Sequence, residues 1–281
     1  MAYFQLFYFL HWNSLIRRGK MEFDDVNFCT HAKVYILLAR RLELIMNILI
    51  CNDDGIEASG IVKLAEIANL FGDVYVVAPS GQRSATSHGI TSHEDMIVRV
   101  VDFPVPVKAA FSVDGTPADC ARLGVTCLLP VQPDIIFSGI NRGYNLGFDT
   151  IYSGTVGAAR EGLRRGLKAI AVSMYHDEDY RIIDAYLKDV LETILKEDIS
   201  SNEIWNINTP HRKVEDVKGI KYTSLATYSY FEHSFVKEQI GENEFRVYTA
   251  RANRDEFEKG SDIEAIEDGY ISVSKIRGLY Y

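Results

Sequence analysis

The chain has 281 residues, of which 47% are hydrophobic and 25% charged, so it can bury a sizeable core in one large domain or two modest ones. Its formal net charge of −9 disfavours binding to nucleic-acid polymers or to anionic lipid, although a small anionic substrate is compatible with it where local features offset the charge. The four cysteines form no CxxC pair and no zinc spacing, which favours core thiols in a reducing cytoplasm.

Residues 1–45 differ from the rest of the chain. They open with MAYFQLFYFLHW, which is apolar but too short to span a bilayer, and the basic residues Arg17 and Arg18 follow this stretch instead of preceding it. We therefore expect an N-terminal extension over 1–45, no membrane partner, and a domain over 46–281. An interfacial membrane anchor is the alternative for the extension.

From Met46 the chain alternates between short apolar runs and segments whose apolar residues recur at helical spacing. The apolar runs predict strands at 47–51, 74–78, 97–101, 107–113, 134–138, 169–173 and 205–208. The helical segments lie at 61–71, 116–129, 156–165 and 184–195. Thr116 is a suitable N-cap, with Pro117 and Asp119 at capping positions after it. This rhythm predicts an α/β fold over 46–210: a Rossmann-like, mostly parallel sheet with helices on both faces.

Residues 211–281 change in character. Their first part, from Gly219 to Arg251, is rich in Tyr, Val and Thr and contains the turn signal Gly-Glu-Asn at 241–243. This composition predicts an antiparallel hairpin followed by a C-terminal arm. The tyrosines between Tyr222 and Tyr230 could stack on a base, but packing within a sheet is the favoured explanation.

Three segments with oxygen-bearing side chains follow predicted strands. NDDG (52–55) follows the first strand, a polar loop with Ser84 follows the second, and SGIN (138–141) follows a later one. In open α/β sheets ligands bind beyond the carboxyl ends of the strands, and oxygen donors suit Mg²⁺, Mn²⁺ or Ca²⁺ rather than zinc. A hard divalent cation would neutralise the adjacent Asp53 and Asp54, whereas the alternative is that one of them only caps the following helix.

The segment YSGTVGAAREG adds a candidate anion site. Ser153, Gly154 and Thr155 stand at a predicted helix N-terminus, where backbone N–H groups and hydroxyls favour a phosphate, although a plain Ser/Thr cap is the alternative. NRGYNLG, just before it, places Arg142 and Asn145 beside the proposed cation. A cation and a phosphate cradle on one rim indicate phosphoryl chemistry.

Six stretches in chain order resemble the SurE family of stationary-phase survival proteins: ILICNDDGIEASGI, VVAPSGQRSATSHGIT, VDGTPADC, IIFSGINRGYNLGFDTIYSGTVGAAREG, WNINTP and DIEAIEDGYISVS. The resemblance implies a Rossmann-like nucleotidase that needs a divalent metal, Mg²⁺ or Mn²⁺, and removes phosphate from nucleoside 5′- and 3′-monophosphates. It also implies a homodimer or homotetramer built through a projecting hairpin and swapped C-terminal elements.

The family's site residues carry over onto positions of this sequence. The metal ligands match Asp53, Asp54, Ser84 and Asn141. The substrate side comprises Asn52, Gly139, Asn145, Ser153, Gly154 and Thr155. Asp53 and Asp54 are the catalytic candidates, and the resemblance favours Asp53 for the chemical role of base or nucleophile. Residues 1–45 have no family counterpart, and the ending GYISVSKIRGLYY is shorter than the family's usual C-terminal segment, which puts the oligomer in doubt.

Two other classes of protein compete with a phosphomonoesterase. A receiver-like signalling module also carries paired acids after its first strand and binds Mg²⁺, but the Asp and Lys that it needs at later strand ends have no match in VDGTPADC or AIAVSMYHDEDY. A dinucleotide-binding oxidoreductase would need G-x-G-x-x-G after the first strand, which is missing. His88 and His93 are weaker candidates for proton donors, since a solvated loop histidine is the simpler explanation.

Overall fold

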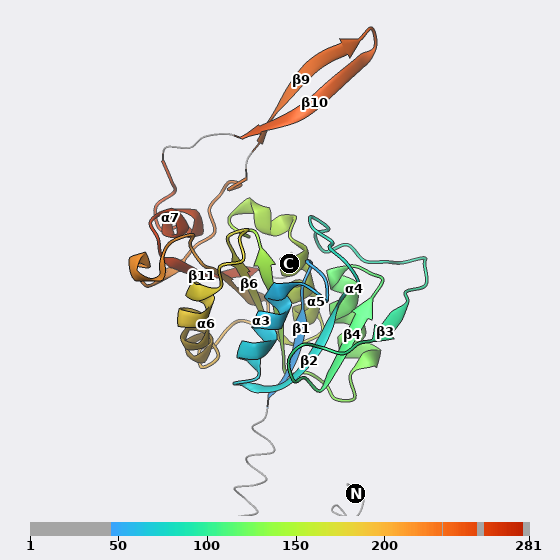
Figure 1. Ribbon diagram of the computed structural model, residues 1–281. Coiled ribbons are helices and arrows are strands. Elements are labelled where there is room, and N and C mark those ends of the chain that lie inside the picture. Colours follow the sequence, from blue (N-terminus) through green and yellow to red (C-terminus); the bar gives the residue numbers. More distant parts are fainter. Residues whose placement is uncertain (1–45, 232, 252–255, 278–281) are drawn as a thin grey trace, which may run out of the picture. The chain divides into compact units, whose positions relative to one another are not determined.

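A computed structural model describes residues 46–231, 233–251 and 256–277 (Figure 1). The expectations for residues 1–45 lie outside this part of the chain. None of the helices within the described residues has the length and hydropathy that crossing a bilayer requires.

Nine strands of the described residues form one sheet in the order β3-β4-β2-β1-β5-β6-β7-β11-β8. Their bounds are β1 (Met46–Cys51), β2 (Gly72–Pro79), β3 (Val98–Val100), β4 (Ala109–Val113), β5 (Ile135–Arg142), β6 (Lys168–Met174), β7 (Glu203–Asn208), β8 (Ile220–Thr223) and β11 (Ile271–Arg277). Neighbours are parallel except for the pairs β3–β4 and β7–β11. The predicted mostly parallel sheet is therefore confirmed.

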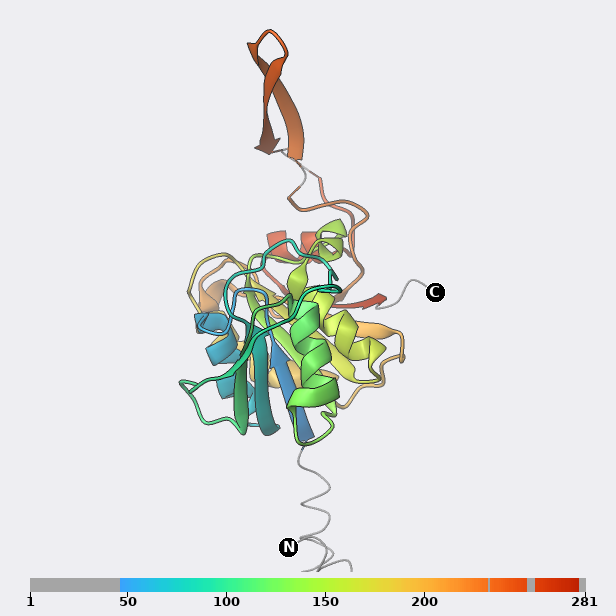
Figure 2. The same cartoon turned by 90° about the vertical axis from the view of Figure 1, so that its right-hand side faces the viewer.

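Helices cover both faces of this sheet, as Figures 1 and 2 show. One face packs against α3 (Ser59–Ala68) and α6 (Arg181–Ile194), and the other against α4 (Pro117–Leu123) and α5 (Gly154–Arg164). Successive β1 residues alternate between the two: Ile48 and Ile50 belong to the first core, Leu49 and Cys51 to the second. Burial on both faces explains why β1 is apolar without alternation.

The capping signals of α4 are confirmed. The Thr116 hydroxyl accepts a hydrogen bond from the Asp119 amide (3.1 Å), and Asp119 Oδ2 accepts one from the Thr116 amide (3.0 Å). The helix continues as a π-helical turn over Gly124–Leu128. Short 3-10 turns lie at Phe148–Ile151 and Val214–Asp216, and a short helix α7 at Asp262–Glu267.

The C-terminal region differs in part from the expected hairpin and arm. β9 (His233–Gly241) and β10 (Glu244–Arg251) form the predicted antiparallel hairpin as a sheet of their own. In contrast, β8 and β11 join the nine-stranded sheet, so the sheet extends past residue 210. For β11 the reason is the burial of apolar side chains: Ile271 and Val273 lie in the core that α3 and α6 cover.

The topology places a ligand crevice at one edge of the sheet. From β1 the chain runs outward through β2 and β4, and then returns to pair β5 with the other side of β1. Strand order therefore reverses between β1 and β5, and in open α/β sheets this switch point opens beyond the carboxyl ends of the strands.

Candidate active site

β1 ends in a turn that carries Asp53 and Asp54 at the carboxyl edge of the sheet. The buried Asn52 closes this turn, because its Nδ2 donates to the Gly55 carbonyl (2.8 Å) and its Oδ1 accepts from the Gly55 amide (3.2 Å). Gly55 has a φ of +103°, a left-handed conformation that favours glycine. The Asn52 side chain, which we expect on the substrate side, is thus engaged in shaping the loop.

Asp53 is a buried carboxyl, 3% exposed, whose Oδ1 accepts a 2.5 Å hydrogen bond from the Thr155 hydroxyl. Burial raises the pKa of Asp53 to about 6, although the Thr155 hydrogen bond opposes this rise; the charge of Asp54 adds to it. The ionised form of Asp53 is destabilised in this environment unless a positive charge lies beside it. A cation at this position would therefore be bound with a favourable electrostatic contribution.

Asp54 is half-buried and reaches the end of β5. Its Oδ2 accepts a hydrogen bond from the Arg142 backbone N–H (3.1 Å). The Arg142 guanidinium pairs with Glu178 (2.6 Å), a mostly exposed residue of the β6–α6 loop. The contact between Asp54 and Arg142 ties the ends of the neighbouring strands β1 and β5 together.

Gly139 and Asn141 lie at the end of β5, one strand away from Asp53. A Cβ on Gly139 would lie 2.3 Å from the Val172 carbonyl oxygen, and its φ is +138°, so only glycine fits there. Asn141 Nδ2 donates to the Gly143 carbonyl (2.8 Å), so the amide oxygen is the atom of this side chain that could act as a metal ligand. The strand thus offers one neutral oxygen ligand beside the two carboxylates.

Ser84 is exposed in the long loop after β2, where its Oγ accepts a hydrogen bond from Gln82 Nε2 (3.0 Å). The preceding residue, Arg83, donates its backbone N–H to the Asp53 carbonyl oxygen (2.7 Å). The loop therefore touches the β1 turn one residue before Ser84.

The N-terminus of α5 packs directly on Asp53. The Ser153 hydroxyl is the N-cap and accepts from the backbone N–H three residues later (3.1 Å), while the Thr155 hydroxyl donates to Asp53. A Cβ on Gly154 would lie 2.9 Å from both Asp53 Cβ and Thr86 Oγ1, so glycine permits this approach. Both hydroxyls of the SGT segment are engaged within the protein, and so is the Val156 amide, so the positive end of the helix dipole is the feature suited to an anion.

Asn145 is the centre of a buried polar network that the sequence analysis missed. Its Nδ2 donates to Ser173 Oγ (2.7 Å), and its backbone N–H donates to Asn208 Oδ1 (2.9 Å). Its carbonyl oxygen accepts from the side-chain amides of Asn206 (2.9 Å) and Asn208 (3.0 Å). The stretch WNINTP carried the available signal, since it places two amides in a buried strand.

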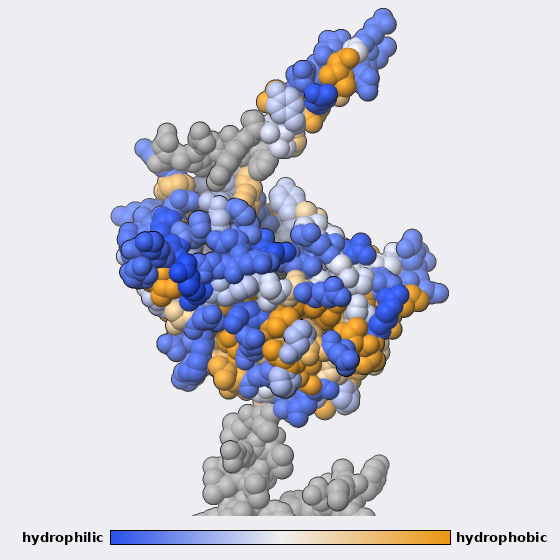
Figure 3. Space-filling view, viewed as in Figure 1, coloured by the Kyte–Doolittle hydropathy of each residue, from blue (hydrophilic) through white to orange (hydrophobic). Residues whose placement is uncertain are grey.

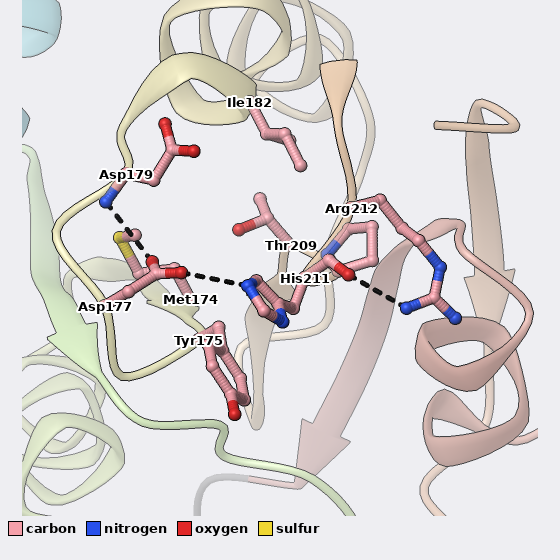
Figure 4. Close-up of a pocket in the computed structure, with 9 residues that line it drawn as sticks. Met174, Tyr175, Asp177, Asp179, Ile182, Thr209, His211 and Arg212 are labelled. Atoms are coloured by element: carbon pink, nitrogen blue, oxygen red, sulfur yellow. Dashed lines mark hydrogen bonds and ion pairs between the residues drawn. The ribbon is translucent and has the colours of Figure 1, made fainter. Parts of the chain in front are cut away.

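A shallow pocket lies at the ends of β6 and β7, on the same edge of the sheet (Figure 4). The rings of Tyr175 and His211 are stacked at 4.0 Å with an angle of 8° between them. His211 Nε2 also lies 3.2 Å from Asp177 Oδ2, so the ring is held from two sides. The remaining lining residues are Met174, Asp179, Ile182, Thr209, Pro210 and Arg212.

The weaker sequence candidates have contacts of their own. His88 Nε2 lies 3.1 Å from Glu161 Oε2 of α5, whereas His93 is exposed. Tyr222 packs edge-on against Trp205, with ring centroids 6.1 Å apart, which agrees with sheet packing rather than base stacking.

The donor set fits a hard divalent cation. Within the described residues no three His, Cys, Asp or Glu side chains gather around a common point, so the two carboxylates Asp53 and Asp54 would need neutral oxygens to complete a shell. Ser84 Oγ, Asn141 Oδ1 and water are such donors. Mg²⁺ binds in this manner, through one or two carboxylates with several waters retained.

Comparison with known proteins identifies the family of this chain. The family model of the survival protein SurE matches residues 48–232. A 5'-nucleotidase SurE from Clostridium botulinum is 40% identical over 237 residues, covering 82% of this chain and 92% of that protein. One from Heliobacterium modesticaldum is 39% identical over 234 residues, covering 82% and 86%.

A solved structure extends the comparison to the fold. The crystal structure of the SurE protein from Aquifex aeolicus has a TM-score of 0.72 to this chain at 34% identity, and the match covers 84% of this chain and 94% of that one. Sequence and fold therefore agree, and the chain belongs to the SurE family.

Proposed function

We propose that this chain is a metal-dependent 5′-nucleotidase, a hydrolase of phosphoric monoesters that releases phosphate from nucleoside 5′- and 3′-monophosphates. One observation carries the proposal: the Asp53/Asp54 turn and the N-terminus of α5 meet through the hydrogen bond from Thr155 to Asp53. A cation-binding pair and an anion-binding helix end thus share one crevice. The relatives' name, 5'-nucleotidase SurE, supports the reaction class.

Different residues of the site would have different roles in the reaction. Asp53, Asp54, Ser84 and Asn141 would hold Mg²⁺ or Mn²⁺, which when bound supplies Lewis-acid polarisation of the phosphoryl group. The N-terminus of α5, where the helix dipole favours negative charge, would bind the phosphoryl oxygens, on which charge gathers in the transition state. Asp53 serves as base or nucleophile, because it lies between the helix end and the other carboxylate.

The substrate side extends along the same sheet edge. The buried network around Asn145 keeps the loop after β5 in place, and Gly139 lets β5 approach β6 closely. The pocket with Tyr175 and His211, at the ends of the next two strands β6 and β7, offers the nucleoside a surface with aromatic rings.

We also propose that the chain assembles as a homodimer or homotetramer in the cytoplasm. The β9–β10 hairpin supports this assembly, since Phe235 is 75% and Val247 58% exposed on a two-stranded sheet. Figure 3 shows hydrophobic surface on this hairpin. An isolated two-stranded sheet is marginal in water, and exposed apolar side chains of this kind are stabilised when a second copy covers them. Sedimentation of the full chain measures this state directly.

Phosphate release from a panel of nucleoside 5′- and 3′-monophosphates, with Mn²⁺ and after exhaustive chelation with EDTA, tests the function. We expect turnover with metal and loss of turnover without it, and we expect Asp53→Asn to lose most turnover while it stays folded. Glu178→Gln is a matched control, because this carboxylate lies near the crevice but is exposed, and its contacts within the described residues are with the Arg142 side chain and Ser59. Full hydrolysis after chelation, or wild-type rates in Asp53→Asn, would refute the proposal.

A further inference from the structure

The loop after β2 has a strained backbone beside Ser84. Ala85 and Ser87 have φ values of +56° and +54°, although neither is glycine. Left-handed conformations are unfavourable for residues with a Cβ and persist where the surroundings hold them. The segment 84–88 therefore needs an external constraint to keep this shape.

Helix α5 and the turn before it supply that constraint. Ser87 donates its backbone N–H to the Tyr152 carbonyl (3.0 Å) and its hydroxyl to the Ile151 carbonyl (2.6 Å). The Ser87 carbonyl lies so close to α5 that a Cβ on Gly157 would come within 2.1 Å of its oxygen. The strained segment thus packs closely against α5, the helix that carries Thr155.

The His88 side chain connects the loop to α5 by a hydrogen bond. Its Nε2 lies 3.1 Å from Glu161 Oε2, and the Glu161 side chain is 4% exposed. Arg165 donates to the other carboxylate oxygen (3.0 Å). A buried carboxylate is strongly destabilised when a partner is lost, so the contact with His88 is favourable for both the loop and the helix.

The contact between His88 and Glu161, here called the clamp, lies four residues from Ser84, a proposed metal ligand. On one side of Ser84, Arg83 binds the Asp53 carbonyl; on the other, Thr86 packs beside Gly154. The path from His88 to Ser84 runs through the two strained residues, so the loop's conformation there depends on the clamp.

We propose that His88 is a positioning residue: its hydrogen bond to Glu161 holds the strained segment 84–88 in the conformation that places Ser84 beside Asp53. This inference rests on the metal-dependent function proposed above. His88 acts through Ser84 and does not touch the substrate. Its role is to keep a neutral ligand in place before the cation arrives.

Mn²⁺ binding without substrate, followed by the EPR signal of the free ion, tests the inference, together with amide hydrogen exchange of the metal-free protein. For His88→Ala we expect the Kd for Mn²⁺ to rise about tenfold, as loss of one hydrogen bond to a charged group implies. The amides of Arg83 and Ser87 should exchange faster. At saturating Mn²⁺, kcat should stay within about threefold of the wild-type value.

Two variants act as controls. His88→Gln keeps a donor near the position of Nε2 and should restore both Mn²⁺ affinity and slow exchange. His93→Ala removes an exposed histidine from the same loop and should behave like the wild type. Unchanged Kd and exchange in His88→Ala, or a His88→Gln variant as impaired as His88→Ala, would overturn the clamp. If the wild-type protein bound no Mn²⁺, the proposed function would fail, and the exchange comparison would still decide about the clamp.

Discussion

Thr155 joins the two halves of the site, and its replacement by valine gives a sharp prediction. Valine keeps the β-branched shape but removes the hydroxyl that donates to Asp53 at 2.5 Å. At pH 8 a carboxyl with a pKa of about 6 is ionised, so the lost bond is one to a buried charge. Such a bond contributes about 1.5–3 kcal/mol. We expect the metal-free protein to lose that much free energy of unfolding.

The same loss should appear in the reaction. Because Thr155 orients Asp53, kcat/KM should fall about tenfold to a hundredfold, since each 1.36 kcal/mol corresponds to about a factor of ten in rate. Urea unfolding in EDTA at pH 8 measures the first quantity, and phosphate release with Mn²⁺ well below the melting temperature measures the second. Thr155→Ser is the matched control, since it keeps the hydroxyl.

Two results would contradict this reasoning. A Thr155→Val protein with the unfolding free energy of Thr155→Ser would show that the hydrogen bond contributes little. A protein that is destabilised yet keeps wild-type kcat/KM would show that Thr155 is a structural residue of the helix start and has no part in catalysis.

Two further predictions concern stability. Burial raises the pKa of Glu161, but the hydrogen bonds from His88 and Arg165 outweigh this effect and hold the pKa below the ordinary 4.5. The wild type should therefore have a larger free energy of unfolding than Glu161→Gln above about pH 5. This difference should shrink as the pH falls further, because the carboxylate is then protonated. Urea titrations between pH 4 and 7 measure it, and a pH-independent difference would contradict the assignment. A chain that begins at Met46 should keep the wild-type melting temperature and rate, because every site segment lies after residue 45; a large drop in either would show that residues 1–45 belong to the working structure.

Much of the fold could be predicted because its signals are local. Apolar period and capping residues lie within a few positions of each other, so the strand over 47–51 and the Thr116 cap needed no knowledge of the rest of the chain. The carboxyl-edge rule then placed Asp53 and Asn141 on one rim from chain order alone. The place of β11 beside β7 did not follow from local signals, because this strand is held there by burial of Ile271 and Val273 against a core built from distant segments.

The pairing of the polar groups depends on how distant segments pack. The Thr155 hydroxyl appeared in the sequence as one of several groups facing a phosphate, but its partner is Asp53, 102 positions earlier. His88 appeared as a solvated loop residue, yet it binds the buried Glu161, 73 positions away. Hydrogen bonds depend on distances of about 3 Å between atoms, and no sequence period encodes such distances across separate elements. The order of the elements and the chemistry at their ends follow from local residue patterns, whereas the packing of α5 against β1 and the β2 loop decides which partner each side chain meets there.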